Sequence, residues 1–188
     1  MCQHCRAEAQ HRAAPGQLTN AEGHELIDQL TSYERPYPML VLTGGDCFER
    51  PDLVDLIEYA VGKGLHVSIS PSVTPLFTRE RVKAVQDAGV SVMSMSLDGG
   101  SAETHDAFRG FPGTFDRTID ACHMLNELGM RFQLNTVFTA KNIHEAPQML
   151  KNAIDLGAFM FYTFMLVPTG RGQHLDMLTP HEREAVSY

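Results

Sequence analysis

The feature that most constrains the fold is an alternation of short apolar runs with segments of helical period along most of the chain. The apolar runs cover residues 39–43, 65–70, 91–97, 131–138 and 159–167, and they are mostly apolar on both faces, as buried parallel strands are. Helices are expected at residues 21–31, 51–62, 79–88, 115–128 and 144–156, with a last one from Pro180 onward. Gly64, Gly89 and Gly129 are glycine stops at the ends of three of them.

Repeated strand–helix units with right-handed crossovers form either an open doubly wound sheet or a barrel. Each strand here ends in a small or polar cluster: TGGD (43–46), SPSVT (70–74), SLDGG (96–100), NTVFT (135–139) and VPTGRG (167–172). Five such clusters favour a barrel rim, because barrels carry their chemistry at the C-terminal ends of the strands. The sequence therefore predicts an α/β fold, a partial (β/α)6 TIM-type barrel of parallel strands in one domain over residues 1–188. Its first strand is expected to be missing.

Composition and charge exclude several classes of protein. The chain is 43% hydrophobic and 20% charged, which is typical of a globular protein. The net charge is -8 and no stretch is a basic run, so no nucleic-acid partner is expected. The longest nearly uncharged apolar stretch, residues 159–168, is well short of the roughly 20 residues that a spanning helix needs. We expect no membrane partner and a cytoplasmic location.

Cys2 and Cys5 form a CxxC pair at the start of the chain. Zinc sites, thioredoxin-like redox pairs and iron–sulfur sites all use this spacing. A zinc-stabilised binding domain needs two more ligands at short spacing, but Cys47 and Cys122 are isolated in the sequence. A thioredoxin-like pair follows a strand, and no strand is expected here. His4, between the two cysteines, is expected to face solvent or to lie behind the metal ligands.

Two strand-end clusters have the chemistry of a ligand site. In TGGD, Gly44 and Gly45 let the backbone approach a ligand closely, and the carboxylate of Asp46 can accept a hydrogen bond from an ammonium group. The alternative is a plain strand-to-helix turn with a partly solvated aspartate. On the strand over residues 91–97, the alternation places Ser94 and Ser96 on one face. Pairing with backbone groups is the alternative to ligand binding, and we expect it more for Ser94.

Arg109, in the stretch DAFRG, is the best candidate for carboxylate recognition. A guanidinium group presents two parallel donors that match the two oxygens of a carboxylate. The alternative is a surface ion pair with Asp106 or Asp116.

Six stretches together resemble the radical SAM superfamily, in order and at matching places on the strand–helix scaffold. They are CQHC, LTGGD (42–46), MSLDG (95–99), ETHDAFRG (103–110), GTF (113–115) and LVPTGRG (166–172). SLDG, THDAFRG and GTFDRTI are similar to the branch that often carries a C-terminal auxiliary-cluster domain of the SPASM type, with enzymes of peptide modification and of haem and redox-cofactor biosynthesis. Against that branch, the chain is expected to be truncated at both ends.

The resemblance implies the cofactors. Members of the superfamily use a CxxxCxxC loop whose three thiolates hold a [4Fe-4S] cluster, and the fourth iron binds the amino and carboxylate groups of S-adenosylmethionine. Cys2 and Cys5 match the second and third cysteines, and the first would lie three residues before Met1. Cys47, directly after TGGD, is a candidate to substitute for the missing ligand.

The resemblance also implies roles for residues at the strand ends. The implied cofactor-binding residues are Gly44, Gly45, Asp46, Ser70, Ser96, Asp98, Arg109, Asn135 and Leu166. TGGD would meet the ammonium group, Arg109 the carboxylate, and Ser70, Ser96 and Asp98 the ribose, while Asn135 and Leu166 would line the nucleoside and adenine. The sequence does not indicate which residue acts catalytically on a substrate.

The implied activity is that of a radical SAM oxidoreductase or maturase. The reduced cluster cleaves S-adenosylmethionine to give a 5′-deoxyadenosyl radical, which abstracts hydrogen from a cofactor precursor or a peptide. Such an enzyme needs a small-molecule or peptide substrate and an electron donor such as a flavodoxin or ferredoxin. The alternative is an inactive barrel that binds S-adenosylmethionine or a partner chain without a complete cluster.

Overall fold

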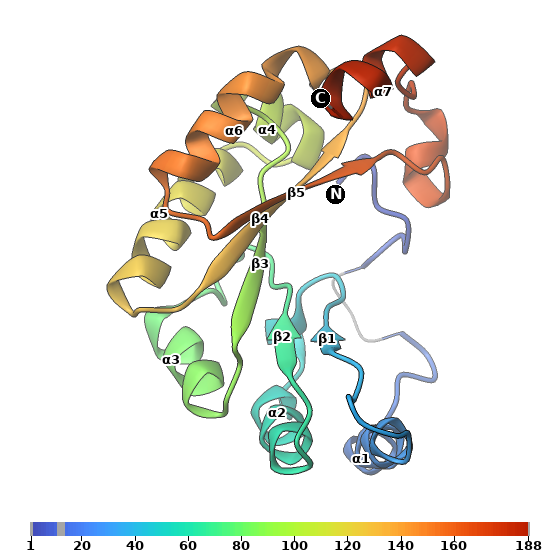
Figure 1. The fold of residues 1–188 in the computed structure, drawn as a ribbon, viewed down its shortest axis with the longest axis vertical. Coiled ribbons are helices and arrows are strands. Elements are labelled where there is room, and N and C mark those ends of the chain that lie inside the picture. Colours follow the sequence, from blue (N-terminus) through green and yellow to red (C-terminus); the bar gives the residue numbers. More distant parts are fainter. Residues whose placement is uncertain (1, 11–13, 188) are drawn as a thin grey trace.

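Five parallel strands form one curved sheet in the computed structural model, which describes residues 2–10 and 14–187 (Figure 1). The strands are β1 (Leu40–Leu42), β2 (Val67–Ile69), β3 (Val92–Ser96), β4 (Phe132–Phe138) and β5 (Met160–Met165). Their order in the sheet is their order in the sequence, and every neighbouring pair is parallel. This arrangement confirms the predicted α/β fold with parallel strands. The ends of the predicted domain, Met1 and Tyr188, lie outside the described residues.

The α-helices are α1 (Asn20–Thr31), α2 (Leu53–Gly62), α3 (Arg79–Asp87), α4 (Ala102–Arg109), α5 (Thr114–Glu127), α6 (Ala146–Asp155) and α7 (Pro180–Ser187). Three 3-10 turns, η1 (Cys47–Glu49), η2 (Ile143–Glu145) and η3 (Gly170–His174), lie in the loops. Gly64, Gly89 and Gly129 have φ values of 89°, 105° and 64°, as expected for glycine stops.

Helix α4 was not predicted from the sequence. It has only eight residues, so few positions are available to show a helical period. Its end signals are nevertheless present in the sequence. The Ser101 hydroxyl accepts a hydrogen bond from the backbone N–H of Thr104, and Gly110 ends the helix with a φ of 74°.

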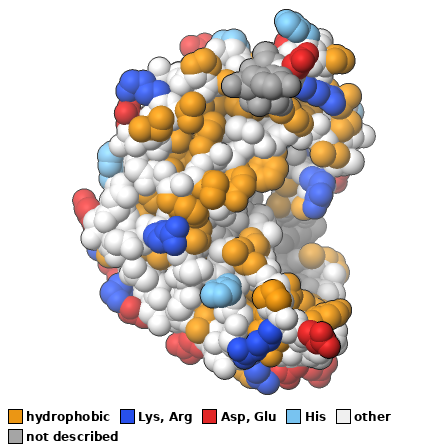
Figure 2. Space-filling model, viewed as in Figure 1, with side chains coloured by type: hydrophobic (Ala, Val, Ile, Leu, Met, Phe, Trp, Pro, Cys, Tyr) orange, Lys and Arg blue, Asp and Glu red, His pale blue; other side chains and the backbone are white. Residues whose placement is uncertain are grey.

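The hydrophobic core lies between the helices and one face of the sheet (Figure 1). Strand residues Val67, Ile69, Met93, Met95, Phe132 and Leu134 pack there with Leu56, Ile57, Val82, Val85 and Leu125 of the helices. On the other face, Met160, Tyr162 and Phe164 of β5 are exposed, and Figure 2 shows apolar side chains gathered along this region. Within the described residues, no helix is both long enough and apolar enough to cross a membrane.

Parallel strands bring their C-terminal ends to one edge of the sheet. The loops after β1, β2 and β3 therefore lie together at that edge, and the N-terminal segment reaches the same place from outside the sheet (Figure 1).

Candidate functional site

A cavity of about 620 Å³ lies at the C-terminal ends of β1, β2 and β3. Eight of the eleven residues predicted to bind metal or cofactor line it: Cys2, Cys5, Gly44, Gly45, Asp46, Ser70, Ser96 and Arg109. The other three, Asp98, Asn135 and Leu166, are not part of its wall. Groups from the two ends of the chain and from three strand ends therefore meet in one pocket.

The cysteine loop, which we define as residues 2–10, has no regular secondary structure. Cys2 and Cys5 are half-buried, free thiols. The backbone N–H of Cys5 donates to the Cys2 carbonyl at 3.4 Å, and the N–H of Ala9 donates to the Cys5 sulfur at 3.4 Å. Among residues 2–10 and 14–187, no three His, Cys, Asp or Glu side chains are arranged to hold a metal ion. The described part of the site thus offers two thiols.

His4 lies in the cavity wall, which excludes the solvent-facing alternative and leaves a place behind the metal ligands as the prediction. Its ring stacks on Phe108, with 4.6 Å between the ring centroids and 23° between the planes. Its Nδ1 is buried and has no hydrogen-bond partner in the part of the chain that the structure describes. Burial lowers the pKa of His4, and the nearby Arg109 and Arg171 add to this effect against the opposing influence of Asp98. The ring is therefore expected to be neutral near pH 7.

Asp46 joins the loops after β1 and β2. Its Oδ1 accepts hydrogen bonds from the backbone N–H groups of Phe48 at 3.1 Å and Ser72 at 3.3 Å, and its Oδ2 accepts from the Thr74 hydroxyl at 2.6 Å. Each carboxylate oxygen has two acceptor positions, so Oδ2 can take one more donor from the cavity. At Gly44, an added Cβ would meet no atom within 4 Å, so this position is open space beside the carboxylate.

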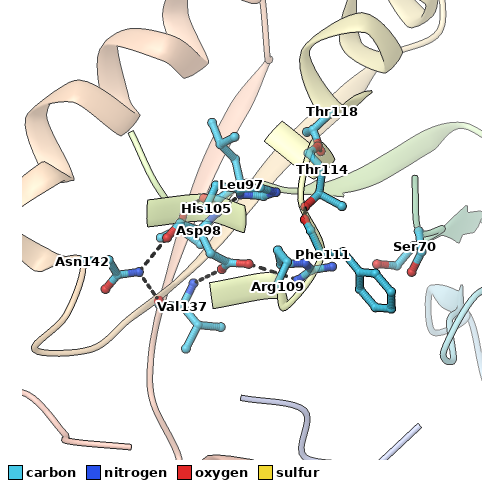
Figure 3. Close-up of polar contacts among 12 residues, drawn as sticks. Ser70, Leu97, Asp98, His105, Arg109, Phe111, Thr114, Thr118, Val137 and Asn142 are labelled. Atoms are coloured by element: carbon cyan, nitrogen blue, oxygen red, sulfur yellow. Dashed lines mark hydrogen bonds and ion pairs between the residues drawn. The ribbon is translucent and has the colours of Figure 1, made fainter. Parts of the chain in front are cut away.

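Asp98 lies behind the cavity wall and holds Arg109 (Figure 3). Its Oδ2 accepts from Arg109 Nη1 at 3.0 Å, and its Oδ1 accepts from the backbone N–H of Val137 at 2.9 Å. Its own N–H donates to His105 Nδ1 at 3.0 Å, and its carbonyl accepts from Asn142 Nδ2 at 2.9 Å. Only 1% of Asp98 is exposed. Its burial leaves none of these polar groups without a partner, because each is hydrogen-bonded inside the protein.

Arg109 pairs with Asp98 and not with the two aspartates considered from the sequence. Asp106 instead accepts hydrogen bonds from the N–H of Phe115 and the Thr114 hydroxyl. Burial lowers the pKa of Arg109, but Asp98 and the two cysteines of the loop outweigh this and raise it. The side chain is only 17% exposed, and a guanidinium has five donors, so those not used by Asp98 are available toward the cavity that it lines.

Three further predicted residues, Ser70, Asn135 and Leu166, lie in different surroundings. The Ser70 hydroxyl donates to the Ser94 carbonyl at 3.4 Å, a long contact that a ligand can replace. Asn135 pairs in register with Ser96 but accepts from the Gln133 side chain at 3.0 Å, outside the cavity wall. Leu166 is buried, with 6% exposed.

Cys47 is not placed to replace a missing ligand. It is 5% exposed, belongs to the hydrophobic core and does not line the cavity. Burial, with a smaller contribution from Asp46, raises the pKa of the Cys47 thiol to about 12, which opposes formation of the thiolate that metals bind.

Arg171 is a site residue that the sequence analysis did not single out. It lines the cavity, and its Nε donates to the Cys2 carbonyl at 3.0 Å. The stretch VPTGRG contains it, but no local pattern indicates a contact across 169 positions.

The model of the Radical SAM superfamily matches residues 1–153 of the chain. Over 187 residues the chain is 42% identical to an AdoMet-dependent heme synthase of Oleidesulfovibrio alaskensis, covering 98% of this chain and 47% of that protein. It is 38% identical over 185 residues to an AdoMet-dependent heme synthase of Methanosarcina barkeri, covering 98% of this chain and 52% of that protein. The chain therefore spans about half the length of these curated relatives.

Solved structures agree at the level of the fold. Streptococcus suis SuiB bound to S-adenosylmethionine superposes with a TM-score of 0.81 at 14% sequence identity, covering 99% of this chain and 43% of SuiB.

Proposed function

The chain belongs to the Radical SAM superfamily, and from this membership we propose that its cavity binds S-adenosylmethionine beside an iron–sulfur cluster held in part by Cys2 and Cys5. The observation that carries the proposal is the composition of one cavity wall. It combines both thiols of the CxxC pair with the TGGD loop, Ser96 and Arg109. The activity that we propose for the whole protein is that of a radical SAM enzyme acting on a cofactor precursor.

The residues of the cysteine loop suit a [4Fe-4S] cluster. Thiolates are the ligands that such clusters use, and N–H groups that donate to their sulfurs tune them, as the N–H of Ala9 does at Cys5. The described residues provide two such thiols and no third ligand beside them. With both groups bound there, a reduced cluster would supply the electron for reductive cleavage of S-adenosylmethionine to a radical able to abstract hydrogen.

The polar groups of the wall suit the methionyl end of S-adenosylmethionine. Asp46 has a free acceptor position for the ammonium group, beside the open space at Gly44. Arg109 would bind the carboxylate, since Asp98 holds its guanidinium in place and leaves other donors free. Ser70 and Ser96 would meet the ribose hydroxyls.

Three residues take indirect roles in this proposal. Asp98 positions Arg109 instead of touching the ribose, because it is buried outside the cavity wall and pairs with Arg109 there. Asn135 and Leu166, which lie outside the wall, would support the neighbouring strands rather than contact the nucleoside.

For the substrate we propose a tetrapyrrole cofactor precursor rather than a peptide. The support is that relatives at 42% and 38% identity are heme synthases. For the electron we propose a one-electron donor protein such as a flavodoxin or ferredoxin.

Anaerobic reconstitution with iron and sulfide tests the proposal. We expect about four irons per chain and binding of S-adenosylmethionine by calorimetry. Cys2→Ala and Cys5→Ala should lose most of the iron, whereas Cys122→Ala, which removes a thiol of the core outside the cavity, should retain it. If the iron content stays near zero while S-adenosylmethionine still binds, the proposed cluster is wrong. The alternative, an inactive barrel that binds S-adenosylmethionine, then applies.

A further inference from the structure

The 3-10 turn η3 (Gly170–His174) packs directly against the cysteine loop, although the two lie near opposite ends of the chain (Figure 1). Three hydrogen bonds from Arg171 join them. Its backbone N–H donates to the Cys5 carbonyl at 3.2 Å, its Nε to the Cys2 carbonyl at 3.0 Å and its Nη1 to the Ala9 carbonyl at 3.4 Å. One residue thus binds both cysteines of the pair and the far part of the loop.

Two glycines face the loop, and Gly170 is the one that allows the close approach. At Gly170, where φ is 54°, an added Cβ would lie 2.5 Å from the Arg6 carbonyl oxygen and 2.7 Å from that of Cys5. At Gly172, an added Cβ would lie 3.5 Å from the His4 carbonyl oxygen. A side chain at position 170 would push the loop away, so glycine at this position lets η3 lie against the backbone of Cys5 and Arg6.

The loop has few bonds of its own to fix its shape. Its internal backbone hydrogen bonds, from Cys5 to Cys2 and from Glu8 to Cys5, are both 3.4 Å long. On the side of α4, Gln3 is held by the carbonyls of Phe108 at 3.2 Å and Ala107 at 2.9 Å. Among residues 2–10 and 14–187, the other hydrogen bonds from outside the loop to its backbone come from Arg171 of η3.

We propose that Arg171 is a positioning residue for the metal site, which fixes the separation and direction of the Cys2 and Cys5 thiols by binding the carbonyls of their loop. This inference rests on the proposed function, in which those thiols hold a cluster. The guanidinium suits the task because it is a rigid fork with several donors, whereas a lysine ammonium is a single point charge on a flexible stem.

The first test is hydrogen exchange by mass spectrometry on the metal-free protein. In Arg171→Gln, amides of residues 2–10 should exchange about tenfold faster, the factor expected for loss of a hydrogen bond to a charged group. Peptides of α5 and α6 should be unchanged, and Arg171→Lys should fall between. Arg183→Gln is the matched control, because its Nε also donates to a carbonyl, that of Leu178 at 3.2 Å, which is not part of the loop.

The second test is the rate of iron loss to a chelator after anaerobic reconstitution, with the visible absorption of the cluster recorded. Arg171→Gln should lose iron about tenfold faster than the wild type and Arg183→Gln, with far-UV circular dichroism unchanged. Wild-type rates of both exchange and iron loss in Arg171→Gln would overturn the positioning role. If the wild type takes up no iron, the proposed function fails, and the exchange experiment alone decides whether Arg171 holds the loop.

Discussion

Replacing Asp98 with Asn removes one charge of the buried pair with Arg109, together with the Oδ2 acceptor for the Arg109 guanidinium. The amide oxygen of Asn can still accept the hydrogen bond from the backbone N–H of Val137, now 2.9 Å from Oδ1. The side chain of Asp98 is 2% exposed and that of Arg109 17%, so the guanidinium would stay largely buried without its counter-charge. The expected loss of stability therefore comes from breaking the contact between Asp98 and Arg109.

Breaking a buried ion pair by removing one partner costs about 3–5 kcal/mol. Arg109 borders the cavity, so water there partly solvates the unpaired charge, and we expect a decrease of about 2–3 kcal/mol in the free energy of unfolding. The matched control is Asp155→Asn. Asp155 pairs with Lys151 on the surface of α6, with both side chains more than half exposed, so this change should cost no more than about 0.5 kcal/mol.

Urea unfolding, followed by circular dichroism, measures both values. A double-mutant cycle with Arg109→Gln should give a favourable coupling of about 1–3 kcal/mol between positions 98 and 109. If Asp98→Asn unfolds within about 0.5 kcal/mol of Asp155→Asn, the pair does not stabilise the fold as its burial suggests, and the argument that Asp98 fixes Arg109 loses its basis.

Three further predictions concern other parts of the structure. Burial lowers the pKa of His105 to about 4, so between this value and about pH 6.5 the unfolded chain binds a proton that the folded chain does not. The free energy of unfolding should therefore fall as the pH drops from about 6.5 toward 4. Urea unfolding at several pH values measures this slope, and His105→Asn should flatten it. The Cys47 thiol should react with iodoacetamide at pH 8 far more slowly than the two loop cysteines in metal-free protein, and equal labelling by mass spectrometry would contradict its burial. Gly44→Ala should leave the melting temperature unchanged but weaken S-adenosylmethionine binding in calorimetry, whereas Gly99→Ala, whose Cβ would overlap the backbone of His105, should lower the melting temperature.

The sequence predicted the fold well where local signals are strong. Each predicted strand contains an observed one, and the observed strands are shorter at one or both ends. The glycine stops succeeded because positive φ is a local property of the chain. Helix α4 was missed because its eight residues offer few positions at which a helical period can show.

The sequence predicted the part of the site that the C-terminal ends of the strands form. Gly44, Ser70 and Ser96 meet because parallel strands share an edge, which follows from the alternation alone. Asp98 was expected to meet the ribose together with Ser96. The strand ends at Ser96, however, and beyond it the chain turns toward α4 and the loop after β4, so the alternation no longer applies.

The contacts of the cysteine loop could not be derived from any local pattern, and this has a consequence for how the metal site forms. None of the described loop residues belongs to the hydrophobic core, and the loop is held from one side by the end of α4 and from the other by η3. Its geometry therefore depends on contacts that exist only after the sheet and helices have formed. In a zinc finger the metal supplies the folding energy, but here the core already does so. Metal-free protein should accordingly unfold cooperatively, with the loop ordered before any iron binds.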